Sequence, residues 1–264
     1  MTDLQDVIAA LVADGDDIDR LVANISDAAW SLPTPAPGWT VKHQIAHLIA
    51  TFKIAGLAAR DPKAFGALAA RLSDDFDANV HATLNPYLSE PPAALLEKFR
   101  YERTVAADAL AQVPADQVVP WLVRPLPPAV LASAGMMELF GHGQDIADAL
   151  GARRTHTDRL AYLVGFGVRT WEFGYLARDL TPPDAEFRFE ITAPSGRLWT
   201  YGPELAGQKV TGPAVDFCLL VTRRRHHLDL AITATGPEAR YWLEIAQAYR
   251  GPAGEGRAPS QFAA

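Results

Sequence analysis

The chain has 264 residues, which is enough for one large domain or two ordinary ones. Hydrophobic residues make up 49% and charged residues 21%, a composition that can bury a core without disulfides. The formal net charge of -7 argues against nucleic acid as the main partner, because phosphate binding needs a concentrated basic surface. We therefore expect a globular protein whose main partner is not nucleic acid.

The beginning of the chain and its cysteine content bear on where the protein works. Residues 1–13 include acidic side chains and lack a basic segment, so they do not resemble a signal peptide. Apolar runs stay below the roughly 18 residues that a transmembrane helix needs. Cys218, the only cysteine, lies in an apolar run and is expected to be a buried, inert thiol rather than a nucleophile. These features predict a cytoplasmic protein without a membrane partner.

Residues 1 to about 180 are predicted to be helical. Apolar residues recur at helical spacing from Leu4 to Ile25, and prolines then interrupt the pattern before Gly38. Thr40 can cap a second helix that continues to at least Phe52. Further helices are predicted over 65–80, 91–112, 133–150 and 158–180, and the four prolines in 120–128 predict an extended connection.

The periodicity changes after residue 182. Phe187, Phe189 and Ile191 alternate with polar residues, as in a half-buried strand. Further strands are expected over 198–201, 208–211 and 228–232, with helices over 213–222 and 238–248. We therefore predict a helical domain over 1–182, a small α+β domain over 183–252 and a mobile tail over 253–264, which is rich in Gly, Ala and Pro.

Glu138 and His142 form the strongest local signal for chemistry. They are four residues apart in a predicted helix and therefore share one face, where a carboxylate and an imidazole can bind one metal ion. The helix is largely apolar, so the pair can point into a core, where a metal would offset the cost of burying the carboxylate. The same spacing also arises by chance on solvated helices, and the pair alone leaves both interpretations open.

His47 lies among apolar residues of another predicted helix, where a histidine is more often a core residue than a ligand. His43, one turn earlier, is a candidate additional ligand, although Lys42 and the start of the helix favour a solvent-facing or supporting role. Together, His47, Glu138 and His142 would leave zinc one open position for water or substrate, as in catalytic zinc sites. Asp145 could hydrogen-bond a liganding imidazole and fix its tautomer, or it could form a surface pair.

Two segments resemble a known family. Residues 38–48, GWTVKHQIAHL, and residues 138–151, ELFGHGQDIADALG, are similar to the metal-binding segments of the DinB-like superfamily, in its mycothiol-dependent maleylpyruvate isomerase branch. The resemblance covers about residues 5–250. It implies an up-down four-helix bundle followed by a small α+β domain with a sterol-carrier-like fold. His43 stands where relatives often have Asp.

The resemblance implies that His47, Glu138 and His142 bind one divalent metal ion. We expect zinc, while nickel, iron and manganese also suit nitrogen and oxygen ligands. It further implies that the metal activates a thiol or water, with mycothiol as a cosubstrate. Arg223 matches an arginine that follows the apolar helix of the second domain in this branch, and it could hold a substrate carboxylate. A solvated helix end or strand edge is the other interpretation of the Arg223 segment.

Three functions remain as hypotheses. The first is a metal-dependent isomerase or S-transferase that acts on a small electrophilic or carboxylate metabolite with a low-molecular-weight thiol. The second is a metal-dependent hydrolase, lyase or isomerase that uses no thiol. The third is a non-catalytic protein that binds a small molecule. Both a monomer and a homodimer are compatible with the sequence.

Overall fold

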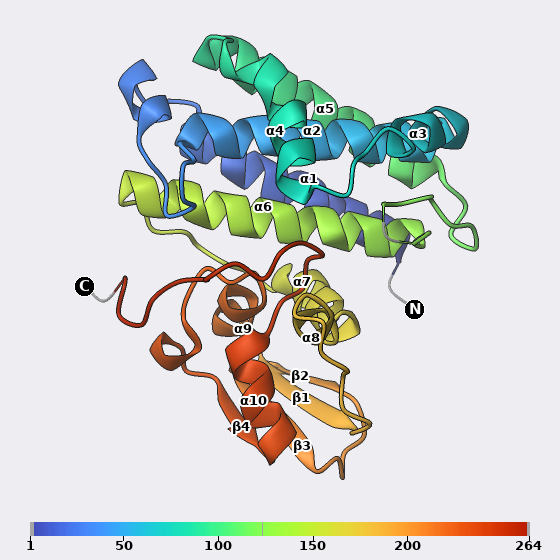
Figure 1. The fold of residues 1–264 in the computed structure, drawn as a ribbon, viewed down its shortest axis with the longest axis vertical. Helices are drawn as coiled ribbons and strands as arrows, with labels where there is room; N and C mark the ends of the chain where they lie inside the picture. Colours follow the sequence, from blue (N-terminus) through green and yellow to red (C-terminus); the bar gives the residue numbers. More distant parts are fainter. Residues whose placement is uncertain (1–2, 123, 263–264) are drawn as a thin grey trace. The chain divides into compact units, whose positions relative to one another are not determined.

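The computed structural model describes residues 3–122 and 124–262. The chain divides into two compact units, Met1–Arg154 and Thr155–Ala264. The first unit is helical, and the second combines helices with a four-stranded sheet (Figure 1). This confirms the predicted helical bundle followed by a small α+β domain. Its likeness to sterol carriers stays a prediction.

Four long helices build the first unit: α1 (Leu4–Val22), α2 (Val41–Arg60), α5 (Pro92–Gln112) and α6 (Pro128–Leu150). Both α1 and α2 pack against α5 and against α6, so the four helices form a bundle (Figure 1). In α1 the buried side chains follow helical spacing, which places one apolar stripe against the bundle core. The core is therefore lined by all four helices and lies along the bundle axis.

The α6 helix begins five residues before the predicted Ser133, because Pro128 suits the first helical turn. It ends at Gly151, whose φ of 61° is the left-handed conformation that glycine adopts without strain. Between these ends, Gly143 lies against Ile18 of α1. A Cβ at Gly143 would come closer than 3.0 Å to that isoleucine, so the close approach of α1 and α6 requires glycine here.

The prediction of one helix over 65–80 is wrong. The structure has two, α3 (Pro62–Ala69) and α4 (Phe76–Leu88). Each has its own N-terminal cap: the Asp61 carboxylate accepts a hydrogen bond from Ala64 N at 2.9 Å, and Asp75 accepts one from Ala78 N at 2.9 Å. These two caps start separate helices, which the apolar spacing does not distinguish.

A sheet with the strand order β2-β1-β3-β4 organises the second unit. Its strands are β1 (Phe187–Thr192), β2 (Leu198–Tyr201), β3 (Gln208–Pro213) and β4 (Thr233–Thr235). The β1 and β3 strands are parallel, whereas β1–β2 and β3–β4 are antiparallel. The α9 helix (Ala214–Val221) packs on β1 and β3, and α10 (Pro237–Ile245) packs on β3 and β4.

Two predicted elements of the second unit differ in the structure. The helix predicted over 158–180 is two helices, α7 (Leu160–Arg169) and α8 (Phe173–Leu176), and both belong to the second unit, so the contact boundary lies before them rather than at 182. The carbonyl of Trp171 accepts a hydrogen bond from the Trp242 indole at 2.8 Å, which places it in tertiary contact at the break between the helices. The strand predicted over 228–232 is wrong: His227–Asp229 form a 3₁₀ turn, and β4 begins after it.

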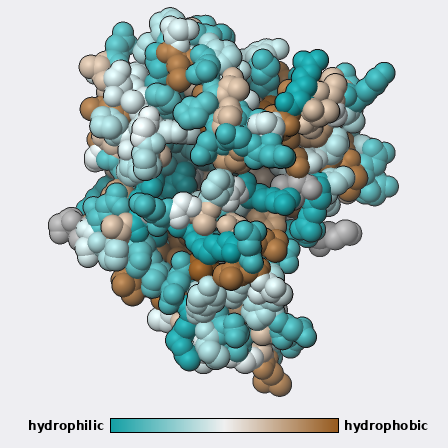
Figure 2. Space-filling view, viewed as in Figure 1, coloured by the Kyte–Doolittle hydropathy of each residue, from teal (hydrophilic) through white to brown (hydrophobic). Residues whose placement is uncertain are grey.

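The end of the chain has no helix or strand among residues 253–262. It nevertheless contacts the rest of its unit: Phe262 lies 3.8 Å from the Arg225 guanidinium, and Ser260 N donates to the Asp229 carboxylate at 2.9 Å. The face in Figure 2 is largely hydrophilic, with smaller hydrophobic areas. Within the described residues, every helix is too short or too polar to cross a membrane.

Candidate metal centre

Two helices of the first unit bring three potential ligands to one point. His47 lies on α2, and Glu138 and His142 lie one turn apart on α6. Glu138 Oε2 is 3.3 Å from His47 Nε2 and 3.1 Å from His142 Nε2. The candidate ligand atoms of all three residues lie within 4.8 Å of one another. Two imidazoles and one carboxylate thus converge, and they belong to the three residues that the resemblance implies as metal ligands; that they bind a metal stays a prediction.

Glu138 is held in its charged form by the two histidines. Desolvation acts to raise its pKa, but the imidazoles beside the carboxylate, His142 first and then His47, outweigh that effect and leave the pKa well below its usual range. The three side chains keep between 12% and 22% of their surface exposed. The cluster is therefore neither sealed in the core nor free in solvent.

A buried glutamine supports His142 from the side away from Glu138. Gln44 lies on α2 one turn before His47 and is fully buried. Its Oε1 is 2.5 Å from His142 Nδ1. Its Nε2 donates to Thr34 Oγ1 at 2.8 Å and lies 3.5 Å from Asp145 Oδ2. Gln44 therefore links α2, α6 and the segment that precedes α2.

Trp39 forms an aromatic wall beside the imidazoles. Its ring is stacked on His142 at 5.9 Å between centroids and tilted against His47 at 5.4 Å. The two imidazoles are 4.4 Å apart. Trp39 is held by the loop before α2, where Thr34 Oγ1 donates to its carbonyl at 2.9 Å. The packed rings restrict how either imidazole can turn.

The structure gives His43 another position. It is not in the group of converging ligand atoms found among the described residues. Its Nδ1 accepts a hydrogen bond from Thr40 N at 3.2 Å and lies 2.8 Å from Thr40 Oγ1, so it closes the first turn of α2. Burial, with the nearby charges of His81 and Lys42, lowers its pKa. These contacts favour the supporting role over that of a fourth ligand.

The two predicted catalytic residues lie in different units. Asp145 is fully buried on α6, and its Oδ2 lies beside Gln44. Arg223 follows α9 in the second unit, is half-buried and adopts a φ of 57°. Its Nη2 donates to the Gly254 carbonyl at 3.3 Å. A catalytic role for either residue stays a prediction.

Sequence reasoning missed Gln44 and underestimated Trp39. Gln44 precedes His47 by three residues, so both project from one side of α2. A glutamine within the apolar stretch from Val41 to Ile49 was the available signal, because a buried amide needs partners. Nothing in the spacing of Trp39 indicates that its ring would face the imidazoles.

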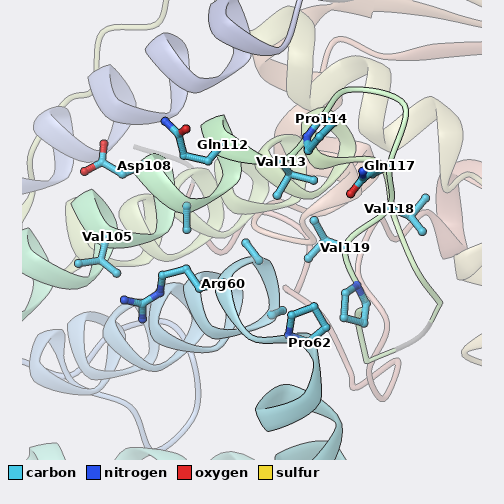
Figure 3. A pocket seen from close by; sticks show the side chains of 14 residues that line it. Arg60, Pro62, Val105, Asp108, Gln112, Val113, Pro114, Gln117, Val118 and Val119 are labelled. Atoms are coloured by element: carbon cyan, nitrogen blue, oxygen red, sulfur yellow. The ribbon is translucent and has the colours of Figure 1, made fainter.

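A separate cavity of about 630 Å³ lies at the other end of α2. It lies between the ends of α2 and α5 and the segment 113–120, as Figure 3 shows. Its lining includes Ala58 and Arg60 but none of His47, Glu138 and His142. Since a helix rises about 1.5 Å per residue, Ala58 is roughly 16 Å along α2 from His47. The cavity is thus distinct from the candidate metal centre.

A four-helix bundle in which two imidazoles and a carboxylate converge from two helices is of the DinB-like class. Residues 11–147 match the family model described as mycothiol maleylpyruvate isomerase N-terminal domain. The chain belongs to this family. Residues 183–235 match a second family model, described as wyosine base formation.

Two relatives and two solved structures are similar to the chain. The uncharacterized proteins MT0041 and Rv0036c of Mycobacterium tuberculosis are each 41% identical to the chain, covering 97% of it and 100% of their own length. Crystal structures of the mycothiol-dependent maleylpyruvate isomerase and of a point mutant of it match 90% of this chain and 96% of theirs, with a TM-score of 0.58 and 14% identity. At that identity the structural match shows the fold.

Proposed function

We propose that this protein is a metal-dependent enzyme that uses a low-molecular-weight thiol, mycothiol, to act on a small electrophilic carboxylate. The convergence of His47, Glu138 and His142 carries the proposal. Membership in a family named for a mycothiol-dependent isomerase supports the choice of thiol. Isomerase and S-transferase are the two reaction types considered.

The geometry of the three side chains fits a zinc ion. Ligand atoms that surround zinc tetrahedrally at about 2.0–2.2 Å lie roughly 3.3–3.6 Å from one another. The two Nε2–Oε2 separations are 3.1 and 3.3 Å, close to that spacing before any ion is bound. Glu138 is held as a carboxylate, which is the form that binds a cation.

Three protein ligands leave one position of a tetrahedral ion for an exogenous group, which is the arrangement of catalytic rather than structural zinc sites. When bound, the ion supplies positive charge that favours the deprotonated form of a thiol or water at that position. The protein's own contribution is to fix both imidazoles by stacking and hydrogen bonding, and to place Trp39 beside them.

A thiolate can add to one carbon of an activated alkene. In an isomerase, the adduct then rotates about the carbon–carbon bond that has become single. The adduct next expels the same thiolate, which restores the double bond in the other configuration and regenerates the thiol. In a transferase, the adduct takes up a proton and leaves as product. Arg223 is proposed to hold the substrate carboxylate through paired hydrogen bonds, and Asp145 to act on His142 through Gln44.

Metal content is the first test. We expect near one equivalent of zinc in protein purified without chelator, and loss of that metal in His47→Ala and in His142→Ala, by plasma mass spectrometry. His81→Ala provides a matched control, because His81 is outside the converging group. Metal-free wild type that takes up neither zinc nor nickel would refute the proposal.

Thiol dependence is the second test. Turnover of maleylpyruvate and related unsaturated acids should require both the metal and mycothiol. A rate that needs the metal but is unchanged without thiol would favour the metal-dependent hydrolase, lyase or isomerase instead. Binding of the acid without turnover, with or without thiol, would favour the non-catalytic protein.

A further inference from the structure

The hydrogen bonds around Gln44 determine which way its amide faces. The Thr34 hydroxyl donates its proton to the Trp39 carbonyl at 2.9 Å, so its oxygen must accept at its other contact. That contact is Gln44 Nε2 at 2.8 Å. The Asp145 carboxylate, 3.5 Å from the same nitrogen, is also an acceptor. Both neighbours therefore require the NH₂ group on this side of Gln44.

With the amide in this orientation, its oxygen faces His142. Gln44 Oε1 can only accept, and it is 2.5 Å from His142 Nδ1. His142 Nδ1 must therefore carry a proton. In the neutral imidazole the proton is then absent from Nε2, and the Nε2 lone pair points at Glu138 Oε2, 3.1 Å away. Two acceptors face each other, an arrangement that a cation between them stabilises.

We propose that Gln44 is a positioning residue that sets His142 in the Nδ1–H tautomer and so presents its Nε2 lone pair to the metal. This inference rests on the proposed function and assigns Gln44 a task within it. Liganding histidines generally donate their second ring N–H to an oxygen acceptor, which fixes tautomer and orientation. Here the acceptor is an amide that is itself oriented by Thr34 and Asp145.

A comparison with His47 shows what the hydrogen bond from His142 to Gln44 adds. Among the described residues, its Nδ1 is buried without a hydrogen-bond partner. Its ring is positioned by packing against Trp39 and His142. The two liganding imidazoles are therefore held differently: His142 has its tautomer fixed by a hydrogen bond, and His47 has its orientation restricted by stacking. Removing Gln44 should change the tautomer of His142 and leave that of His47 as it is.

The tautomer can be measured in metal-free protein. Long-range ¹H–¹⁵N spectroscopy of neutral histidine distinguishes the two ring nitrogens. We expect His142 to be protonated at Nδ1 in the wild type. In Gln44→Met, which keeps the side-chain length but has no amide, the proton should move to Nε2, where Glu138 accepts it. A neutral wild-type His142 that carries its single ring proton on Nε2 would overturn the proposal without any variant being needed.

Zinc affinity supplies the second measurement, by competition with a chelator. Gln44→Met should weaken zinc binding by about 10–100-fold, the usual effect of losing a partner of a liganding histidine. Gln144→Met is the matched control: Gln144 lies on α6, as His142 does, but its amide donates to Asp148 at 2.8 Å, so zinc binding should be unchanged. Thermal denaturation of both metal-free variants shows whether they fold.

The two proposals fail differently. If wild type binds no zinc, the proposed function is wrong, and the tautomer measurement still decides the role of Gln44. If wild type binds zinc and a folded Gln44→Met binds it equally well, the metal centre stands and the positioning role of Gln44 is refuted.

Discussion

Gly143 offers a direct test of how the packing of α1 and α6 holds the candidate metal centre. It follows His142 in sequence, and a methyl group placed on it would overlap Ile18 Cδ1. Ile18 is fully buried, so it has little room to move. We expect Gly143→Ala to force the two helices apart or to push Ile18 out of its favoured rotamer.

The size of the effect follows from two opposing contributions. Overpacking a filled core costs about 1–3 kcal/mol, while replacing glycine by alanine inside a helix gains up to about 1 kcal/mol. The net change should be a loss of roughly 0–3 kcal/mol in the free energy of unfolding. Ile18→Val removes the overlapping methyl group and alone should cost about 0.5–1.5 kcal/mol.

The double variant separates overlap from any other cause. With Val at position 18, the new methyl group no longer meets Cδ1, and only the close contact with the Arg154 guanidinium at 3.1 Å remains, so Gly143→Ala should cost less than in the wild type. We therefore expect a favourable coupling of roughly 1–3 kcal/mol between the two changes, since residues in contact are not additive. Urea unfolding of the metal-free proteins measures it, and zinc affinity lost in Gly143→Ala should return in the double variant.

Gly66→Ala serves as the control, because no atom lies within 4 Å of a Cβ placed at Gly66. This substitution should raise the free energy of unfolding only through the higher helix propensity of alanine, and by the same amount with Ile or Val at position 18. If the effects of Gly143→Ala and Ile18→Val simply add, within about 0.5 kcal/mol, the close approach of α1 and α6 does not govern this site.

Three further predictions concern single residues. Glu138→Gln should abolish the thermal stabilisation by zinc, which for wild type is about 2.7 kcal/mol when free zinc is 100 times Kd; an unchanged melting shift would remove Glu138 from the ligand set. The Tyr175 hydroxyl is buried without a partner in the described structure, so Tyr175→Phe should keep or raise stability by up to about 1 kcal/mol in chemical denaturation. Burial also raises the pKa of Tyr175 to about 12. The contribution of the protonated Tyr175 to the free energy of unfolding is therefore fully present below the ordinary tyrosine pKa near 10 and is lost as the pH rises towards 12. This loss should be absent in Tyr175→Phe. Arg223→Lys should raise KM for a carboxylate substrate about tenfold with kcat retained, the loss of one paired hydrogen bond; unchanged KM would favour the solvated interpretation.

Part of the candidate metal centre could be predicted from the sequence, because helix geometry fixes the spacing of two of its three residues. Glu138 and His142 share a face at i and i+4 whatever surrounds them. The position of His47 beside them depends on the packing of α2 against α6. The apolar periodicity of the two helices indicates that each has a buried face, but it does not indicate which residues of α2 lie opposite which residues of α6. The resemblance to DinB-like bundles provided this alignment.

Gln44 could not be identified in the same way. Its role depends on Thr34, His142 and Asp145, which come from a loop and another helix. Single-sequence patterns report the face of a helix but not the partner opposite it. The break after Arg169 was hidden for the same reason, since the Trp171 carbonyl is bound by an indole 71 residues later in the chain.

The loop before α2 has its ends joined, because Pro33 and Thr40 form a β-bridge and Thr34 N donates to Trp39 O at 2.8 Å. Three of its residues are prolines, which restrict the unfolded chain as much as the folded one. Little backbone entropy is therefore left to lose when this loop places Trp39 beside the imidazoles. A ligand that stacks on Trp39 would meet a surface already ordered, and its affinity would not be reduced by the cost of closing a flexible segment.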